Sequence, residues 1–221
     1  MTFPVRLRRM LHPVFLRLWL RFARDRELVT HIDGMRLVVL PTVFHPRFFG
    51  SSRVLADYVR MLDLSGKRFL DLGTGSGIIG LAASRSGARV TAVDVNPRAV
   101  ECARRNAGHA GVAMVCSASD LFSALPGERF DIVAWNPPFF PRAARSPAEF
   151  ALFAGDDYAA IRRFNAEVRE HLAPDGRIFL VLSRDLDLAA WRAICNEAGF
   201  QLTTRFERSW GGEVMIVVEA E

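Results

Sequence analysis

The most constraining feature of this sequence is a regular alternation that runs from Lys67 to the C-terminus. Short apolar stretches are separated by segments with helical periodicity, which begin or end at proline or glycine. Strands that alternate with helices form a mostly parallel sheet with helices on both faces. The sequence therefore predicts an α/β fold with a doubly wound, mostly parallel, seven-stranded sheet and a C-terminal antiparallel strand. The expected strands are residues 68–73, 89–95, 112–118, 130–136, 177–183, 201–210 and 211–221.

The residues ahead of this alternation predict a small extension. Two apolar stretches within residues 28–40 flank Asp33-Gly34, which is a strong signal for a two-residue hairpin turn. A loop rich in proline and aromatic residues follows, and then a helix that we expect Ser51 or Ser52 to cap. The expected division of the chain is a basic N-terminal helix and β-hairpin extension, 1–50, and a main domain, 51–221.

Basic charge is concentrated at the N-terminus. Residues 1–26 hold seven arginines and a single acidic residue, a net charge of +6, whereas the whole chain carries +5. From Val14 to Arg26, arginines recur at helical spacing, so we predict a helical arm that packs on the main domain or contacts RNA or a membrane surface. Arg17 interrupts the apolar run, which is much shorter than the roughly 20 residues of a membrane span. We therefore expect neither a secretion signal nor a transmembrane segment.

A glycine-rich loop joins the first strand of the alternation to its first helix. The segment FLDLGTGSGIIG contains Gly73, Gly75 and Gly77, with Thr74 between the first two. Glycine admits positive φ angles and leaves the backbone bare for a ligand, while the following helix offers unbonded N–H groups and a positive dipole end. The pattern alone is weak evidence for a nucleotide site, because tight helix–strand packing also favours glycine.

Three aspartates indicate which ligand fits this loop. Asp71 precedes the first glycine, where a pyrophosphate would disfavour an anion and an ammonium group would favour it. Asp94 ends the second strand, where a carboxylate can accept two hydrogen bonds from a ribose diol. Asp120 follows the third strand and can accept from an adenine amino group. Together these groups describe S-adenosylmethionine, although Asp94 could instead cap the next helix and Asp120 could simply stabilise a turn.

The segment DIVAWNPPFF ends the fourth strand abruptly. Pro137 and Pro138 have no N–H to donate to a strand ladder, so the chain leaves the sheet directly after Asn136. The result is a stiff corner that presents an asparagine and two aromatic rings, Phe139 and Phe140. The alternative interpretation is an ordinary sheet-edge turn with buried aromatic side chains.

Together, the D-L-G-T-G-S-G loop, Asp94 and the N-P-P-F motif resemble class I S-adenosylmethionine-dependent methyltransferases, over roughly residues 41–221. More narrowly, they resemble the branch that methylates planar nitrogens, which includes HemK-like glutamine-N5 methyltransferases and enzymes that methylate amino groups of RNA and DNA bases. The resemblance implies a Rossmann-like methyltransferase fold and an enzyme without a metal ion. It also implies that S-adenosylmethionine is bound by Asp71, Gly73, Thr74, Gly75, Gly77, Asp94, Asp120 and Asn136.

The N-P-P-F corner suits methyl transfer to nitrogen. A primary amide or aryl amine is a poor nucleophile, because its lone pair is delocalised into the attached π-system. The Asn136 side-chain oxygen and the Pro137 carbonyl can each accept one N–H of the target NH2, which favours a pyramidal nitrogen with its lone pair aimed at the methyl group. Phe139 can stack on the flat acceptor. We therefore predict catalytic roles for Asn136, Pro137 and Phe139.

The sequence leaves the identity of the methyl acceptor open between two subfamilies. Pro46-Arg47 resembles the segment ahead of the glycine loop in HemK-like enzymes, whereas Val43-Phe44 and Gly50-Ser51 resemble rRNA guanine-amino methyltransferases. We expect a cytoplasmic enzyme whose substrate is a release factor, a ribosomal protein or RNA, with the basic arm contacting RNA or the ribosome. The alternatives are a methyltransferase for a small molecule and a catalytically silent module that only binds S-adenosylmethionine.

Overall fold

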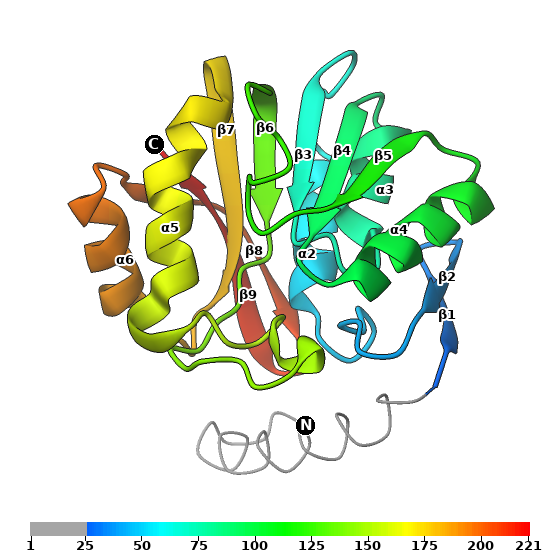
Figure 1. Cartoon of the computed structure of the whole chain (residues 1–221), viewed down its shortest axis with the longest axis horizontal. Helices are drawn as coiled ribbons and strands as arrows, with labels where there is room; N and C mark the ends of the chain where they lie inside the picture. The colour runs from blue at the N-terminus through cyan, green and yellow to red at the C-terminus, as the bar shows by residue number, and fades with distance from the viewer. Residues whose placement is uncertain (1–25) are drawn as a thin grey trace.

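A computed structural model describes residues 26–221 (Figure 1), and the predicted basic arm lies outside these residues except for Arg26. The described strands are β1 Leu28–Ile32, β2 Met35–Val39, β3 Arg68–Leu72, β4 Arg89–Asp94, β5 Met114–Ala118, β6 Phe130–Trp135, β7 Leu172–Ser183, β8 Leu202–Trp210 and β9 Glu213–Ala220. Strands β3 to β9 form one seven-stranded sheet in the order β5-β4-β3-β6-β7-β9-β8. The pairs from β5 to β7 are parallel, and β9 runs antiparallel to both β7 and β8. The predicted sheet is thus confirmed.

Helices cover both faces of this sheet. Successive strand residues point to opposite sides, so Phe69 enters one core with α2 and α3 while Leu70 enters the other with α5 and α6. Figure 1 shows α5 and α6 on one side of the strands. This two-layer covering is what the alternation predicted. The helices are α2 Ser51–Val59, α3 Ile78–Arg85, α4 Pro97–Ala110, α5 Ala159–Glu167 and α6 Leu188–Glu197, with 3-10 turns at Pro147–Glu149, Asp156–Tyr158 and Val168–His171.

The predicted hairpin is confirmed, and it is fastened to the main domain. Asp33 and Gly34 both have positive φ, 50° and 74°, as the tight turn between β1 and β2 requires. The Asn106 side chain on α4 accepts from Val38 N at 2.8 Å and donates to Val38 O at 2.7 Å. The same amide donates to Ser76 O at 2.9 Å. One buried asparagine therefore ties β2 to the glycine loop.

The first turn of α2 differs from the prediction. Gly50 is the N-terminal cap residue of α2, and no side chain caps the helix. Ser51 and Ser52 therefore do not cap it. Their hydroxyls bind the side chain of Asn136 instead, a partner more than 80 residues away.

The segment around Pro174 also differs. We expected a Pro-Asp-Gly helix exit followed by a strand, but β7 already begins at Leu172. The extra residues form an irregularity opposite β6, where the register shifts between Phe130 and Ile132. Asp175 adopts a positive φ of 60° there. Within residues 26–221, no helix has the length and apolar character needed to cross a membrane.

Candidate active site

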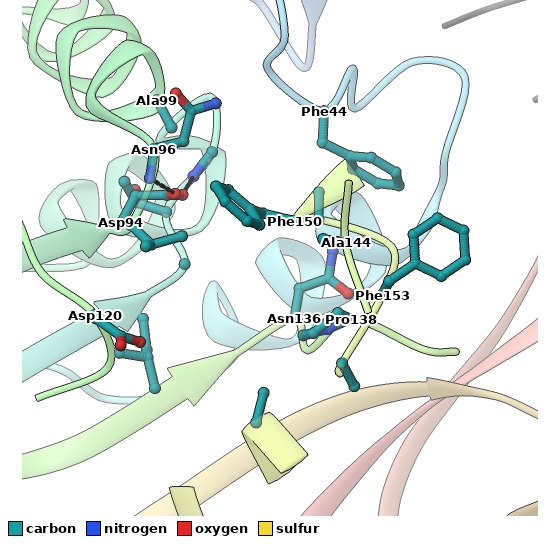
Figure 2. Close-up of a pocket in the computed structure, with 18 of the residues that line it drawn as sticks. Phe44, Asp94, Asn96, Ala99, Asp120, Asn136, Pro138, Ala144, Phe150 and Phe153 are labelled. Atoms are coloured by element: carbon teal, nitrogen blue, oxygen red, sulfur yellow. Dashed lines mark hydrogen bonds between the residues drawn. The ribbon is translucent and has the colours of Figure 1, made fainter. Parts of the chain in front are cut away.

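A cavity of about 540 Å³ lies at the carboxyl ends of β3, β4 and β6. Open α/β sheets bind ligands at this edge, and the volume suits a ligand of cofactor size. Figure 2 shows Asp94 and Asp120 on one side of the view, Asn136 and Pro138 on the other, and the Phe150 ring between Asp94 and Asn136. The predicted site residues that line the cavity are Gly73, Thr74, Gly75, Asp94, Asp120 and Asn136.

The glycines of the loop serve different purposes. Gly75 has a φ of 54°, and a Cβ built there would meet no atom closer than Gly73 O at 4.0 Å, so its backbone lies open. Gly77 has a φ of 84°, and a Cβ there would lie 3.0 Å from the Cα of Ala103 on α4. Gly77 thus permits close packing of α3 against α4 and does not line the cavity. Close packing therefore accounts for Gly77, whereas Gly75 leaves open backbone at the cavity wall.

Asp71 lies beneath the loop and not in the cavity. Its carboxylate Oδ2 accepts from Thr74 Oγ1 at 2.6 Å and from Gly80 N at 2.9 Å, and the residue is fully buried. Its Oδ1 is buried without a hydrogen-bond partner in the described part of the chain. Burial raises the pKa of Asp71 to about 7. The expected direct contact with an ammonium group is corrected accordingly: this carboxylate shapes the loop from below.

Asp94 lies where a ribose-binding carboxylate was predicted. Its Oδ2 accepts from Gly75 N at 2.9 Å and its Oδ1 accepts from Asn96 N at 2.9 Å, and the residue lines the cavity. Burial raises the pKa of Asp94 to about 6. The helix-cap alternative does not hold, because Asn96 caps α4 by accepting from Arg98 N at 3.0 Å. Each Asp94 oxygen keeps a further lone pair for a ligand hydroxyl.

Asp120 lines the cavity but already has a partner. Both of its carboxylate oxygens accept from Arg163 Nη1, at 3.2 Å and 3.0 Å. Both side chains are about half exposed, so the pair is accessible to solvent and to a ligand. An adenine amino group would have to share this carboxylate with the guanidinium. The sequence did not reveal the pairing, because Arg163 comes from α5, 43 residues further along the chain.

Asn136 stands directly after β6 with its amide held in place. Its Nδ2 donates to Ser51 Oγ at 3.0 Å and to Ser52 Oγ at 2.7 Å. Among residues 26–221, no hydrogen bond reaches its Oδ1. Pro137 is buried, whereas Pro138 is half-buried and lines the cavity. The corner therefore offers a polar amide at the wall of the same cavity that contains the glycine loop.

Phe139 does not lie where a stacking residue was expected. It is partly buried, packs against the core beside α5 and α6, and is absent from the cavity wall. The cavity is lined instead by Phe44, Phe150 and Phe153. Once the two prolines redirect the chain, the Phe139 ring gains more by covering apolar core than by facing the cavity.

A loop of residues 141–153, which we call the cavity loop, supplies part of this aromatic wall. Its base is closed by hydrogen bonds from Phe140 N to Leu152 O at 3.0 Å and from Ala154 N to Phe140 O at 2.8 Å. The Arg142 guanidinium lies 3.7 Å from the centre of the Phe153 ring, a cation–π contact. Phe150 is 39% exposed and lines the cavity. No sequence motif marked this residue.

Residues assigned to the N-terminal extension also reach the site. Thr42, Val43 and Phe44 line the cavity, and Asn96 Nδ2 donates to Thr42 Oγ1 at 3.3 Å. Asn96, which caps α4 and donates its backbone N–H to Asp94, thus also binds the chain that leaves the hairpin. The cavity therefore crosses the expected division at residue 50.

Comparison with known proteins places this architecture in a family. The family model described as methyltransferase small domain matches residues 34–204. A release factor glutamine methyltransferase from Deinococcus radiodurans is 34% identical over 145 residues, 57% of this chain and 52% of that protein. A ribosomal RNA small subunit methyltransferase C from Chromohalobacter salexigens is 34% identical over 156 residues, 66% of this chain and 43% of that protein.

Solved structures share the fold. The T. thermophilus 16S rRNA N2 G1207 methyltransferase in complex with AdoMet and guanosine aligns with a TM-score of 0.62 at 24% identity, covering 89% of this chain and 50% of that chain. This chain thus spans about half the length of each of the three proteins compared. The predicted Rossmann-like methyltransferase fold and the predicted family are confirmed. Since the matched region includes both the glycine loop and the Asn136 corner, this chain belongs to the methyltransferase small domain family.

Proposed function

We propose that this protein transfers a methyl group from S-adenosylmethionine to a planar NH2 group, either a glutamine side chain of a protein or an exocyclic amine of an RNA base. The observation that carries the proposal is the shared cavity: Asn136 of the N-P-P-F corner lines the same cavity as Gly75 and Asp94. Related proteins named as glutamine and ribosomal RNA methyltransferases support this function over a small-molecule methyltransferase or a silent binding module.

The residues of the cavity fit the cofactor. The open backbone at Gly73, Thr74 and Gly75 and the free acceptor capacity of Asp94 suit a molecule with an amino acid end and a ribose diol. Asp120 with Arg163 borders the cavity where a base would be recognised. Asp71 and Gly77 contribute indirectly, by shaping the loop and by packing α3. When bound, S-adenosylmethionine supplies an electrophilic methyl group on a positively charged sulfur.

Asn136 and Pro137 prepare the acceptor. The Asn136 Oδ1 and the backbone carbonyl of Pro137 accept hydrogen bonds from the two N–H groups of the target. These bonds favour a pyramidal nitrogen, whose lone pair is less delocalised into the attached π-system. The lone pair released in this way is then available for the methyl group. The main contribution of the corner is positioning, which is worth up to roughly 7–11 kcal/mol in favourable cases.

We propose that Phe150 of the cavity loop, and not Phe139, stacks on the flat acceptor. Phe150 borders the cavity with much of its ring exposed, whereas Phe139 packs on the core. An aromatic face tolerates the positive charge that develops on nitrogen during transfer. Phe44 and Phe153 extend the same wall and suit a flat amide or base.

The acceptor is proposed to be a component of translation. A release factor, a ribosomal protein and an RNA are each consistent with the family, and each would place the enzyme in the cytoplasm. We propose that residues 51–221 carry the catalytic machinery, with Thr42–Phe44 completing the wall. The basic N-terminal arm, with its net charge of +6 in residues 1–26, is proposed to contact RNA or the ribosome.

A labelling experiment tests the function. The purified protein is incubated with radiolabelled S-adenosylmethionine and an extract of cells that lack it, and labelled protein is then separated from labelled RNA. Transfer of label to one macromolecular fraction, and its loss in the Asn136→Ala variant, is the expected outcome. Label found only in small molecules, or equal label with Asn136→Ala, would contradict the proposal.

A further inference from the structure

Two hydroxyl groups from a distant part of the chain hold the Asn136 amide. Ser51 and Ser52 receive its Nδ2 at 3.0 Å and 2.7 Å. Ser51 is 2% exposed, and Ser52 lines the cavity beside Asn136. A primary amide carries its donors on nitrogen and its acceptors on oxygen. Fixing the nitrogen therefore also fixes the direction of the oxygen.

We propose that Ser51 and Ser52 are positioning residues, which keep the Asn136 amide turned so that Oδ1 faces the methyl acceptor. The inference rests on the proposed function and adds the origin of its selectivity. An acceptor NH2 offers N–H donors, so it needs an oxygen opposite it. With the amide flipped, Nδ2 would face the NH2, and two sets of donors would oppose each other. A serine hydroxyl can also donate, so the two serines hold the amide plane, and with Nδ2 bonded to both of them Oδ1 is left for the N–H donors of the acceptor.

The serines can do this because the start of α2 is itself clamped. A Cβ built at Gly50 would lie 2.1 Å from the Trp210 ring, so the backbone rests directly on the indole. Arg53, one residue beyond the serines, lies over the same ring at 4.7 Å. Its guanidinium also donates to Asp33 Oδ1 in the hairpin turn at 2.8 Å. The hairpin and the β8–β9 end of the sheet therefore fix the two hydroxyls relative to β6.

The test is a mutational cycle read as initial rate of methyl incorporation into the labelled fraction of the extract. Ser51→Ala with Ser52→Ala is expected to lower this initial rate by roughly 10- to 100-fold, because a misdirected group near the reacting atoms costs about that much. Binding of S-adenosylmethionine, measured by calorimetry, should stay unchanged. The control Ser84→Ala removes a hydroxyl on α3 that donates to Ala113 O at 3.2 Å, and it should keep the wild-type rate.

The same double change is then made in Asn136→Ala. If the serines act through Asn136, they cause no further loss there. A loss by the same factor in both backgrounds, or an unaltered rate in the wild-type background, would overturn the positioning role and leave the proposed function standing. A fully active Asn136→Ala enzyme would instead overturn the proposed function.

A conservative variant gives a second readout that does not depend on the residual activity of Asn136→Ala. Ser52→Thr keeps a hydroxyl beside Asn136 and should turn over close to the wild-type rate, whereas Ser52→Ala should not. Equal losses in Ser52→Thr and Ser52→Ala would show that the hydroxyl is not what matters. Thermal unfolding of each variant separates these effects from loss of fold.

Discussion

At the scale of single residues, the two aspartates near the glycine loop differ in what remains free on their oxygens. Asp71 has one oxygen committed to Thr74 and Gly80 and is sealed from the cavity. Asp94 binds backbone N–H groups with both oxygens but stays at the cavity wall. We therefore propose that Asp94, and not Asp71, contacts the ribose, while the hydrogen bonds of Asp71 hold the conformation of the loop.

Replacing Asp94 with alanine tests this assignment. The variant should bind S-adenosylmethionine about 10- to 100-fold more weakly, which corresponds to roughly 1.5–3 kcal/mol for hydrogen bonds to a charged group. Wild-type affinity should also fall as the pH drops through about 6, because Asp94 is protonated there and loses its charge. Isothermal titration calorimetry at several pH values measures both effects.

The matched control is Asp63→Ala, which removes an exposed carboxylate that accepts from Ser65 N at 3.2 Å outside the cavity. This variant should bind the cofactor as the wild type does. An unchanged affinity in Asp94→Ala would limit Asp94 to supporting the backbone of Gly75 and Asn96.

At the scale of elements, we propose that the cavity loop and the N-P-P-F corner share two tasks, stacking on the acceptor and hydrogen bonding to it, that we predicted for the motif alone. The corner supplies Asn136, and the cavity loop supplies Phe150. The residue that we propose to stack, Phe150, could not be read from the motif, because a loop of residues 141–153 follows no periodic pattern. Its path is set by the bridge between Phe140 and Phe153 at its base.

Two phenylalanine variants separate these tasks. Phe150→Ala should lower kcat/KM by roughly tenfold through lost stacking, with little change in the thermal midpoint, because the side chain is already partly exposed. Phe139→Ala should do the reverse and reduce the free energy of unfolding by about 1–3 kcal/mol, less than the loss for a fully buried ring. Methyl transfer assays and thermal unfolding are measured on both proteins. Loss of catalysis in Phe139→Ala at unchanged stability would return the stacking role to Phe139.

At the scale of the whole molecule, the sequence predicted the sheet and the positions of the glycine loop and Asp94 because their signals are local. The glycine loop and Asp94 lie at strand ends that the apolar stretches already located. The contacts made by Ser51 and Ser52 were not predictable in this way, since a serine at a helix start usually caps it. Only the folded chain brings them to Asn136. The surroundings of Asn136, where we propose that the acceptor binds, are thus built from long-range contacts.

The buried Asp71 carboxyl links the loop to the stability of the whole fold. Its pKa rises from an ordinary value of 3.8 to about 7, chiefly through burial, so folding takes up a proton at intermediate pH. The stabilisation from this proton is complete below the ordinary pKa and is lost as the pH rises through about 7. Asp71→Asn should retain an acceptor for Thr74 and Gly80 but cannot titrate.

We therefore expect the free energy of unfolding to fall more steeply with rising pH in the wild type than in Asp71→Asn, by up to about 1.4 kcal/mol per pH unit for one proton. Urea denaturation from about pH 5 to pH 8 measures the two slopes. Glu101→Gln, which neutralises an exposed acid on α4, should keep the wild-type slope. Parallel curves of unfolding free energy against pH for the wild type and Asp71→Asn would mean that Asp71 has the same pKa in the folded and unfolded chain. Burial would then not suppress the ionisation of Asp71.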